Sequence, residues 1–218
     1  MIPENIVQHG GGNPEWEDYF LHLHLMEDGR THMDLRLACG DMAEGFTIIE
    51  HNQFGTHPVN VMAKTPKNLN NLHMNTMLSD NEGLILLSTG KYRIHNASYE
   101  RAILHFQPCR SQVDAAPFTS APFSNQIPER MIDLHGYWMI EAAGKESTIS
   151  RIPPHQSRHY RRQWVNTISK TSVIHKPEIQ RLDSIFSLTT NPMLNTIARE
   201  TNLSVKTVRK YGRLLGYL

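Results

Sequence analysis

Imidazole, carboxylate and guanidinium side chains alternate with apolar ones along Thr31–Leu37, which reads Thr-His-Met-Asp-Leu-Arg-Leu. Successive side chains of a β-strand point to opposite faces, so this alternation is typical of a strand. His32, Asp34 and Arg36 are therefore expected on one face and the apolar residues on the other. Three such groups in a row on one pleated face are able to do chemistry together.

A second alternating run, Leu21–Met26, lies just upstream and has His22 and His24 on a common face. Glu27–Arg30, which reads Glu-Asp-Gly-Arg, separates the two runs. Asp-Gly between alternating hydrophobic segments is a strong signal for a β-hairpin. We therefore predict a hairpin whose strands bring both histidines next to the His-x-Asp-x-Arg face, within reach of a shared ion.

The residue types on this face indicate a metal site that acts on phosphate. A carboxylate and neutral imidazoles are common ligands of Mn²⁺ and Zn²⁺. An arginine beside them can hold a phosphate through paired hydrogen bonds. A metal that polarises a phosphoryl oxygen, with a histidine to move a proton, forms a site that cleaves phosphoesters. The alternative is that these residues only make the polar outer face of a half-buried hairpin.

The stretch His32–Leu37 resembles the His-x-Asp-(Leu/Phe)-Arg-Leu motif of the 3′-phosphoesterase domain in the bacterial repair ligase called ligase D. The resemblance extends loosely over residues 18–142. It implies a compact β-barrel that trims the 3′ ends of DNA with manganese. It also implies that His32 and Asp34 bind the metal, that Arg36 contacts a phosphate, and that His57, in His57-Pro58, is the catalytic histidine.

One metal histidine of that family falls on Met26, and a thioether is a poor ligand for Mn²⁺. His24 lies two residues earlier on the same strand face, so we expect it to take that role. The predicted metal ligands are His24, His32 and Asp34, with Mn²⁺ as the expected ion and Zn²⁺ as the second choice. A relative of this fold that binds nucleic acid without catalysis is the alternative.

Short strands separated by turns follow the hairpin. Turns are expected at 40–45 and 68–71, and a long proline-rich loop is expected at 108–128. Further strands are expected at 46–50, 59–63, 83–88, 91–95, 101–107 and 131–142. This pattern predicts a small antiparallel β-barrel or sandwich over residues 1–150.

Residues 151–176 form a basic linker or helix in which Arg158, Arg161 and Arg162 alternate with aromatic residues. Such a mixture is common on surfaces that bind nucleic-acid phosphates and bases. A solvated amphipathic helix explains it equally well.

Residues 177–218 read as helices and resemble the helix-turn-helix family. Asn202 occupies the turn position that favours a positive φ, and Ser204 is a good N-cap for the helix that follows. By this resemblance the recognition helix is 205–212, with four side chains toward DNA: Lys206, Thr207, Arg209 and Lys210. A helical hairpin for protein contacts is the alternative.

The 218 residues carry 22 basic and 21 acidic side chains, so any DNA-binding surface must be local. Two cysteines without CxxC spacing and the lack of a signal peptide or a long apolar run predict a cytoplasmic protein without membrane association. Nucleotide-loop, dinucleotide and serine-hydrolase motifs are missing.

These features predict an α+β protein, and the resemblance to the ligase D domain implies that it acts as a metal-dependent DNA 3′-end phosphoesterase in end processing and repair. Its expected partners are DNA and repair proteins such as a ligase. The alternative function is a non-catalytic transcriptional regulator whose β-domain senses a ligand or dimerises.

Overall fold

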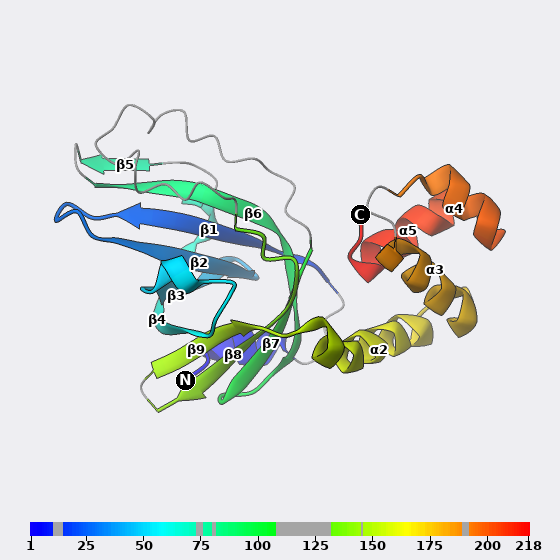
Figure 1. Cartoon of the computed structure of the whole chain (residues 1–218), viewed down its shortest axis with the longest axis horizontal. Helices are drawn as coiled ribbons and strands as arrows, with labels where there is room; N and C mark the ends of the chain where they lie inside the picture. The colour runs from blue at the N-terminus through cyan, green and yellow to red at the C-terminus, as the bar shows by residue number, and fades with distance from the viewer. Residues whose placement is uncertain (11–14, 73–75, 80–81, 108–131, 145, 189–191) are drawn as a thin grey trace. The chain divides into compact units, whose positions relative to one another are not determined.

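The computed structural model describes residues 1–10, 15–72, 76–79, 82–107, 132–144, 146–188 and 192–218 (Figure 1). The chain divides into two compact units, Met1–Ile152 and Pro153–Leu218, which we call the β unit and the helical unit. The proline-rich segment predicted at 108–128 lies outside the described residues. None of the described helices is long and apolar enough to cross a membrane.

The β unit contains most of the secondary structure. Its elements are α1 (Glu4–His9), β1 (Glu17–Leu25), β2 (Thr31–Cys39), β3 (Met42–Ile48), β4 (Val59–Asn68), β5 (Thr76–Ser79), β6 (Glu82–Ala97), β7 (Arg101–Phe106), β8 (Gly136–Ala143) and β9 (Glu146–Arg151), with 3₁₀ turns at His51–Gln53 and Leu69–Asn71. The described strands form one antiparallel sheet in the order β1-β2-β3-β4-β9-β8-β7-β6-β5. β6 also pairs with β1, so the first strand of this order is hydrogen-bonded to the second-last.

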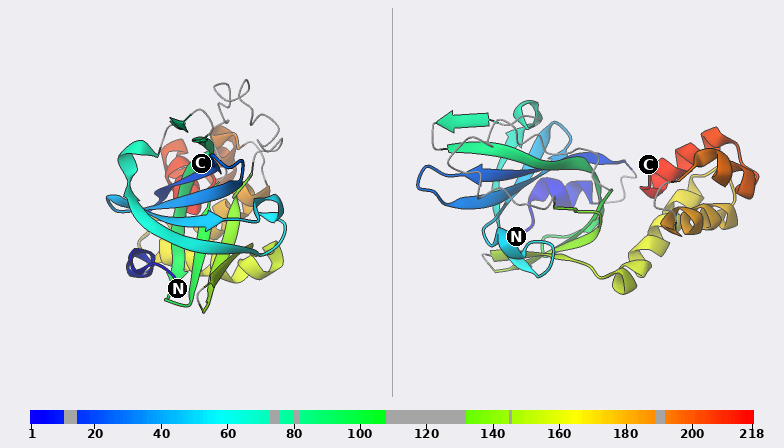
Figure 2. Two further views of the ribbon diagram at one scale, coloured as in Figure 1. Left: turned by 90° about the vertical axis from the view of Figure 1, so that its left-hand side faces the viewer. Right: turned by 45° about the horizontal axis from the view of Figure 1, so that its top comes forward.

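Side-chain alternation builds the core of this unit. Leu21, Leu23 and Leu25 of β1 are fully buried, and they pack with Leu35 of β2 and Phe46 of β3 in one apolar cluster. Ile6 of α1 joins the same cluster, so the short helix packs against the curved strands (Figure 2). Because the apolar residues of β1 and β2 turn inward, the histidines and the carboxylate between them face the opposite side of the sheet.

The prediction of an α+β protein with an antiparallel sheet is confirmed, but several expected boundaries are wrong. The turn expected at 40–45 is shorter, because β3 already begins at Met42 and includes Gly45. The segments expected at 83–88 and 91–95 form one long strand, β6. The strand β9 was not expected at all, since Glu146–Arg151 is polar and pairs with β4 and β8 only through the tertiary fold.

The helical unit consists of α2 (Pro154–Lys170), α3 (Lys176–Leu188), α4 (Leu194–Thr201) and α5 (Val205–Leu215). Trp164 of α2 packs in the centre of this unit, and its indole N–H donates to the Leu214 carbonyl at 2.9 Å. Two residues, Asn202 and Ser204, define the turn between α4 and α5. Asn202 has a left-handed φ of 56°, and the Ser204 hydroxyl accepts a hydrogen bond from the Thr207 N–H at 3.1 Å.

Candidate metal centre

The predicted hairpin brings its polar residues together. β1 and β2 pair with His24 opposite His32 and His22 opposite Asp34. The turn closes through a hydrogen bond from the Met26 N–H to the Arg30 carbonyl at 2.9 Å. Gly29 has a φ of 80° there, a conformation that glycine adopts without a steric penalty. The prediction that the histidines and the His-x-Asp face are cross-strand neighbours is therefore confirmed.

His24, His32 and Asp34 present three ligand atoms that all lie within 4.8 Å of one another. His24 Nδ1 is 3.2 Å from His32 Nε2, and His32 Nε2 is 3.5 Å from Asp34 Oδ1. Two ligand atoms that are each about 2.1 Å from one ion lie roughly 3.0–3.4 Å apart, depending on the coordination angle. These separations and the N, N, O donor set fit a divalent cation.

Asp34 is held by neighbours from β3 and β4. The Thr47 hydroxyl donates to Oδ1 at 2.9 Å, and the Lys64 ammonium donates to Oδ2 at 2.7 Å. Burial alone would raise the pKa of Asp34, but the hydrogen bonds and charges of His32 and Lys64 outweigh burial and hold the pKa well below its usual range. The carboxylate is therefore ionised and fixed in orientation, as a metal ligand requires.

A carboxylate on β6 faces the other side of His24. Glu82 Oε1 lies 3.0 Å from His24 Nε2, whereas Nδ1 of the same ring faces His32. The two histidine rings meet edge to face, with centroids 4.7 Å apart. The cluster therefore consists of three candidate ligands and a second carboxylate that contacts one of them from outside.

His22 lies on the same face but is engaged elsewhere. Its Nε2 is 3.0 Å from the backbone carbonyl oxygen of Leu72, and the side chain is buried. Burial lowers the pKa of His22 to about 4, so the ring is neutral at pH 7. A neutral ring that donates to a backbone carbonyl serves the packing of the sheet.

Arg36 continues the polar face of β2, but its side chain is only 2% exposed. Its Nη1 donates to the backbone carbonyl of Thr65 at 2.9 Å. The guanidinium lies directly over Gly45, where a Cβ atom would come within 2.6 Å of Arg36 Cζ. Lys64, with 28% of its side chain exposed, is the more accessible cation beside Asp34. The assignment of Arg36 as a phosphate contact stays a prediction.

His57 is exposed in the segment before β4, and the contact described for its ring is with Thr56, whose hydroxyl lies 3.0 Å from Nδ1. The histidine of this segment that reaches the hairpin is His51, whose Nε2 lies 3.5 Å from the Thr31 hydroxyl. Within the described part of the chain, the structure therefore groups His57 with its own turn and not with the three candidate ligands.

Sequence reasoning did not find Glu82, and it did not connect Thr47 or Lys64 with Asp34. All three come from other strands and carry no motif of their own. Lys64 is placed by its pairing with Gly45, and Glu82 follows from the pairing of β1 with β6. The strand alternation of β3 and β4 was visible in the sequence, but their register was not.

The predicted DNA-contact residues of the helical unit fall into two groups. On α5, Lys206, Arg209 and Lys210 are exposed, while Thr207 is half-buried. The Thr207 hydroxyl lies 2.8 Å from that of Ser204 and belongs to the N-cap of the helix. Three of the four predicted side chains on α5 are thus open to solvent.

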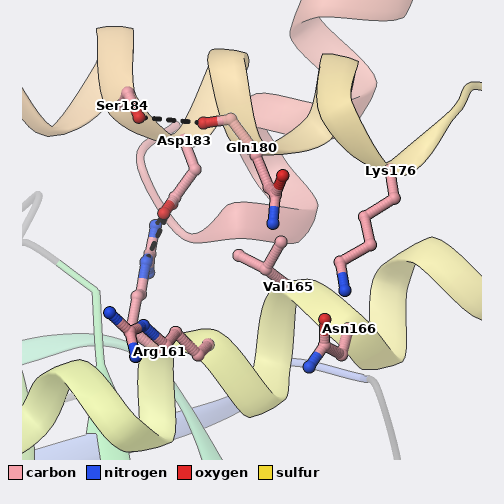
Figure 3. A pocket seen from close by; sticks show the side chains of 8 residues that line it. Arg161, Val165, Asn166, Lys176, Gln180, Asp183 and Ser184 are labelled. Atoms are coloured by element: carbon pink, nitrogen blue, oxygen red, sulfur yellow. Dashed lines mark hydrogen bonds and ion pairs between the residues drawn. The ribbon is translucent and has the colours of Figure 1, made fainter.

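On α2, Arg158 and Arg162 are exposed but Arg161 is engaged. Its Nε and Nη2 donate to one carboxylate oxygen of Asp183, and its Nη1 donates to the Leu215 carbonyl at 2.9 Å. Arg161 therefore joins α2 to α3 and to the end of α5. It also borders a groove of about 340 Å³ between α2 and α3 (Figure 3), whose other cationic side chains are Arg162 and Lys176.

No protein-family model and no curated protein sequence matches this chain.

Proposed function

We propose that the protein is a metal-dependent phosphoesterase that acts on the 3′ ends of DNA. The observation that carries the proposal is the convergence of His24, His32 and Asp34, whose ligand atoms lie within 4.8 Å of one another. We infer that the linked strands of the β unit correspond to the small barrel that the resemblance to the ligase D phosphoesterase domain implies. The product, a 3′-hydroxyl end, is the substrate that a DNA ligase needs.

Within this proposal the two imidazoles and the carboxylate hold a divalent cation, Mn²⁺ in first place and Zn²⁺ in second. A divalent ion bound there would polarise a phosphoryl oxygen. Lys64 fixes the orientation of Asp34 and adds positive charge beside the site, which favours an anionic substrate. His57 is the catalytic histidine that the resemblance implies, and His51, which lies near Thr31, is the competing candidate.

We infer that α4, the turn and α5 form a helix-turn-helix that holds the enzyme on duplex DNA. The left-handed Asn202 and the Ser204 cap support this geometry. Lys206, Arg209 and Lys210 are the proposed phosphate or base contacts, because they are exposed along α5. Arg158 and Arg162 of α2 extend the proposed basic surface.

The test is a primer–template duplex with a 3′-phosphate, incubated with the purified protein and Mn²⁺, Zn²⁺ or Mg²⁺. We expect release of inorganic phosphate and a 3′-hydroxyl end. Asp34→Ala should abolish release, whereas Asp18→Ala should not. Asp18 is a β1 carboxylate that is not among the candidate ligands, and its Oδ1 forms an ion pair with Lys91 Nζ at 2.7 Å. If the wild-type protein releases no phosphate with any of these ions, the enzymatic proposal is wrong.

A second candidate function is a non-catalytic DNA-binding regulator with a sensing or dimerising β unit. The enclosed position of Arg36 favours it, since that residue is the predicted phosphate contact of the catalytic hypothesis. This candidate predicts protection of one DNA sequence in a footprint and no dependence on metal. Binding that is indifferent to sequence would exclude it.

A further inference from the structure

We propose that Glu82 is a positioning residue that sets the ring tautomer of His24 and so prepares its Nδ1 to bind the metal. The inference rests on the proposed metal site and adds a residue that lies 58 positions from its partner in the chain. It concerns the orientation and protonation of one imidazole, and Glu82 itself does not touch the reacting atoms.

The geometry around His24 leaves its two ring nitrogens with different neighbours. Nε2 lies 3.0 Å from Glu82 Oε1, and Nδ1 lies 3.2 Å from His32 Nε2. A neutral imidazole carries one proton, and an ionised carboxylate can only accept a hydrogen bond. The proton of His24 therefore belongs on Nε2, where it is donated to Glu82. The lone pair of Nδ1 is then directed toward His32 and Asp34.

The strand arrangement holds this contact in place. β1 pairs with β6 next to the hairpin, with His24 opposite Leu84 and Leu25 opposite Gly83. Glu82 precedes Gly83 and is the first residue of β6, and its side chain is about one-third exposed. Metal-binding histidines commonly donate their second ring N–H to a carboxylate, which fixes the tautomer and the ring orientation. The contact between Glu82 Oε1 and His24 Nε2 has this form.

The proposal predicts different effects for two substitutions of Glu82. Glu82→Ala removes the acceptor, so the proton of His24 should distribute between Nδ1 and Nε2 and metal affinity should fall about 10- to 100-fold. Glu82→Gln keeps an acceptor oxygen, so it should retain the tautomer and most of the affinity. Glu146→Ala, which removes an exposed carboxylate on β9, is the matched control and should change neither.

Two measurements decide the matter. Long-range ¹H–¹⁵N correlation spectra of the metal-free protein report which nitrogen of His24 carries the proton. Competition with a chromophoric chelator measures the affinity for Zn²⁺, a diamagnetic probe. We expect the Nε2–H form in the wild-type protein and in Glu82→Gln, and loss of that preference in Glu82→Ala together with weaker Zn²⁺ binding.

The outcomes separate this inference from the proposed function. If Glu82→Ala leaves both the tautomer and the affinity unchanged, or if Glu82→Gln weakens binding as much as Glu82→Ala, the positioning role is wrong. If the wild-type protein binds no Zn²⁺, the metal site is wrong, and the positioning role is wrong with it. If Zn²⁺ binds as proposed but no phosphate is released, the enzymatic function is wrong while the role of Glu82 stands.

Discussion

Substitution of Gly45 by alanine should destabilise the β unit, because the guanidinium of Arg36 occupies the space that a side chain would need. An added Cβ would lie 2.6 Å from Arg36 Cζ and 2.9 Å from Arg36 Nε. Carbon atoms in good contact are about 3.5–4.0 Å apart, so the guanidinium has to move by about 1 Å. Such a movement strains or breaks its 2.9 Å hydrogen bond to the Thr65 carbonyl.

The expected loss follows from these two effects. Overpacking of a dense interior costs about 1–3 kcal/mol. A hydrogen bond from a charged donor contributes about 1.5–3 kcal/mol, and part of it is recovered because the residue that supplies the carbonyl, Thr65, is exposed to water. We therefore expect Gly45→Ala to lower the free energy of unfolding by about 2–4 kcal/mol, a shift of the urea midpoint of roughly 1–2 M.

The assay is urea unfolding followed by tryptophan fluorescence in a Trp164→Phe background. Trp16 and Trp138 then report on the β unit alone. Arg36→Leu ends at Cδ and so removes the colliding nitrogens and Cζ, and Gly45→Ala should therefore cost under about 1 kcal/mol in that second background. Equal costs in both backgrounds, or a cost near zero in the first, would contradict the enclosed position of Arg36.

Three further changes have expected outcomes. Asn202→Ala should lower the stability of the helical unit by about 1 kcal/mol, because alanine tolerates a left-handed φ poorly. Asn202→Gly should not lower it. Thermal unfolding followed by circular dichroism measures both effects. Burial raises the pKa of the Cys39 thiol to about 11, so in a Cys109→Ser background it should react slowly with an alkylating reagent at pH 8 until urea is added. Alanine at Lys206 and Arg209 should weaken DNA binding and reduce the slope of log K against log salt by about 0.9 for each phosphate that is no longer neutralised, measured by fluorescence anisotropy.

Each of these predictions has a control variant or an outcome that would contradict it. Asn195→Ala, an exposed change within α4, should not destabilise the helical unit. Rapid alkylation of Cys39 in the folded protein would contradict its burial. Lys170→Ala, at the end of α2, should leave the salt slope unchanged, and an unchanged slope after the α5 substitutions would remove α5 from the proposed DNA-binding surface.

Sequence reasoning succeeded where the relevant information is local. The period-two pattern and the Asp-Gly turn are contained in 17 consecutive residues, Leu21–Leu37, and they determine which side chains share a face. Cross-strand neighbours then follow from the hairpin register, as His24 opposite His32 shows. The cap at Ser204 and the left-handed Asn202 are likewise set by residues next to them in the chain.

Sequence reasoning failed where a residue depends on a strand that is distant in the chain. The glycine at position 45 suggested a turn, whereas it lies within β3, where the Arg36 side chain from β2 covers it. The same packing encloses the guanidinium of Arg36, whose assignment as a phosphate contact stays a prediction. A motif specifies the face of a strand, but it does not specify what packs onto that face.

The amino-acid sequence by itself determined the polar face of the hairpin, the apolar face beneath it and the caps of the last two helices, because these depend on backbone period and on neighbours within a few residues. Only the tertiary structure decided that Lys64 and Glu82 flank Asp34 and His24. Those contacts require β4 to pair with β3 and β6 to pair with β1, each in one register. Register is selected by the packing of the whole sheet rather than by any single segment.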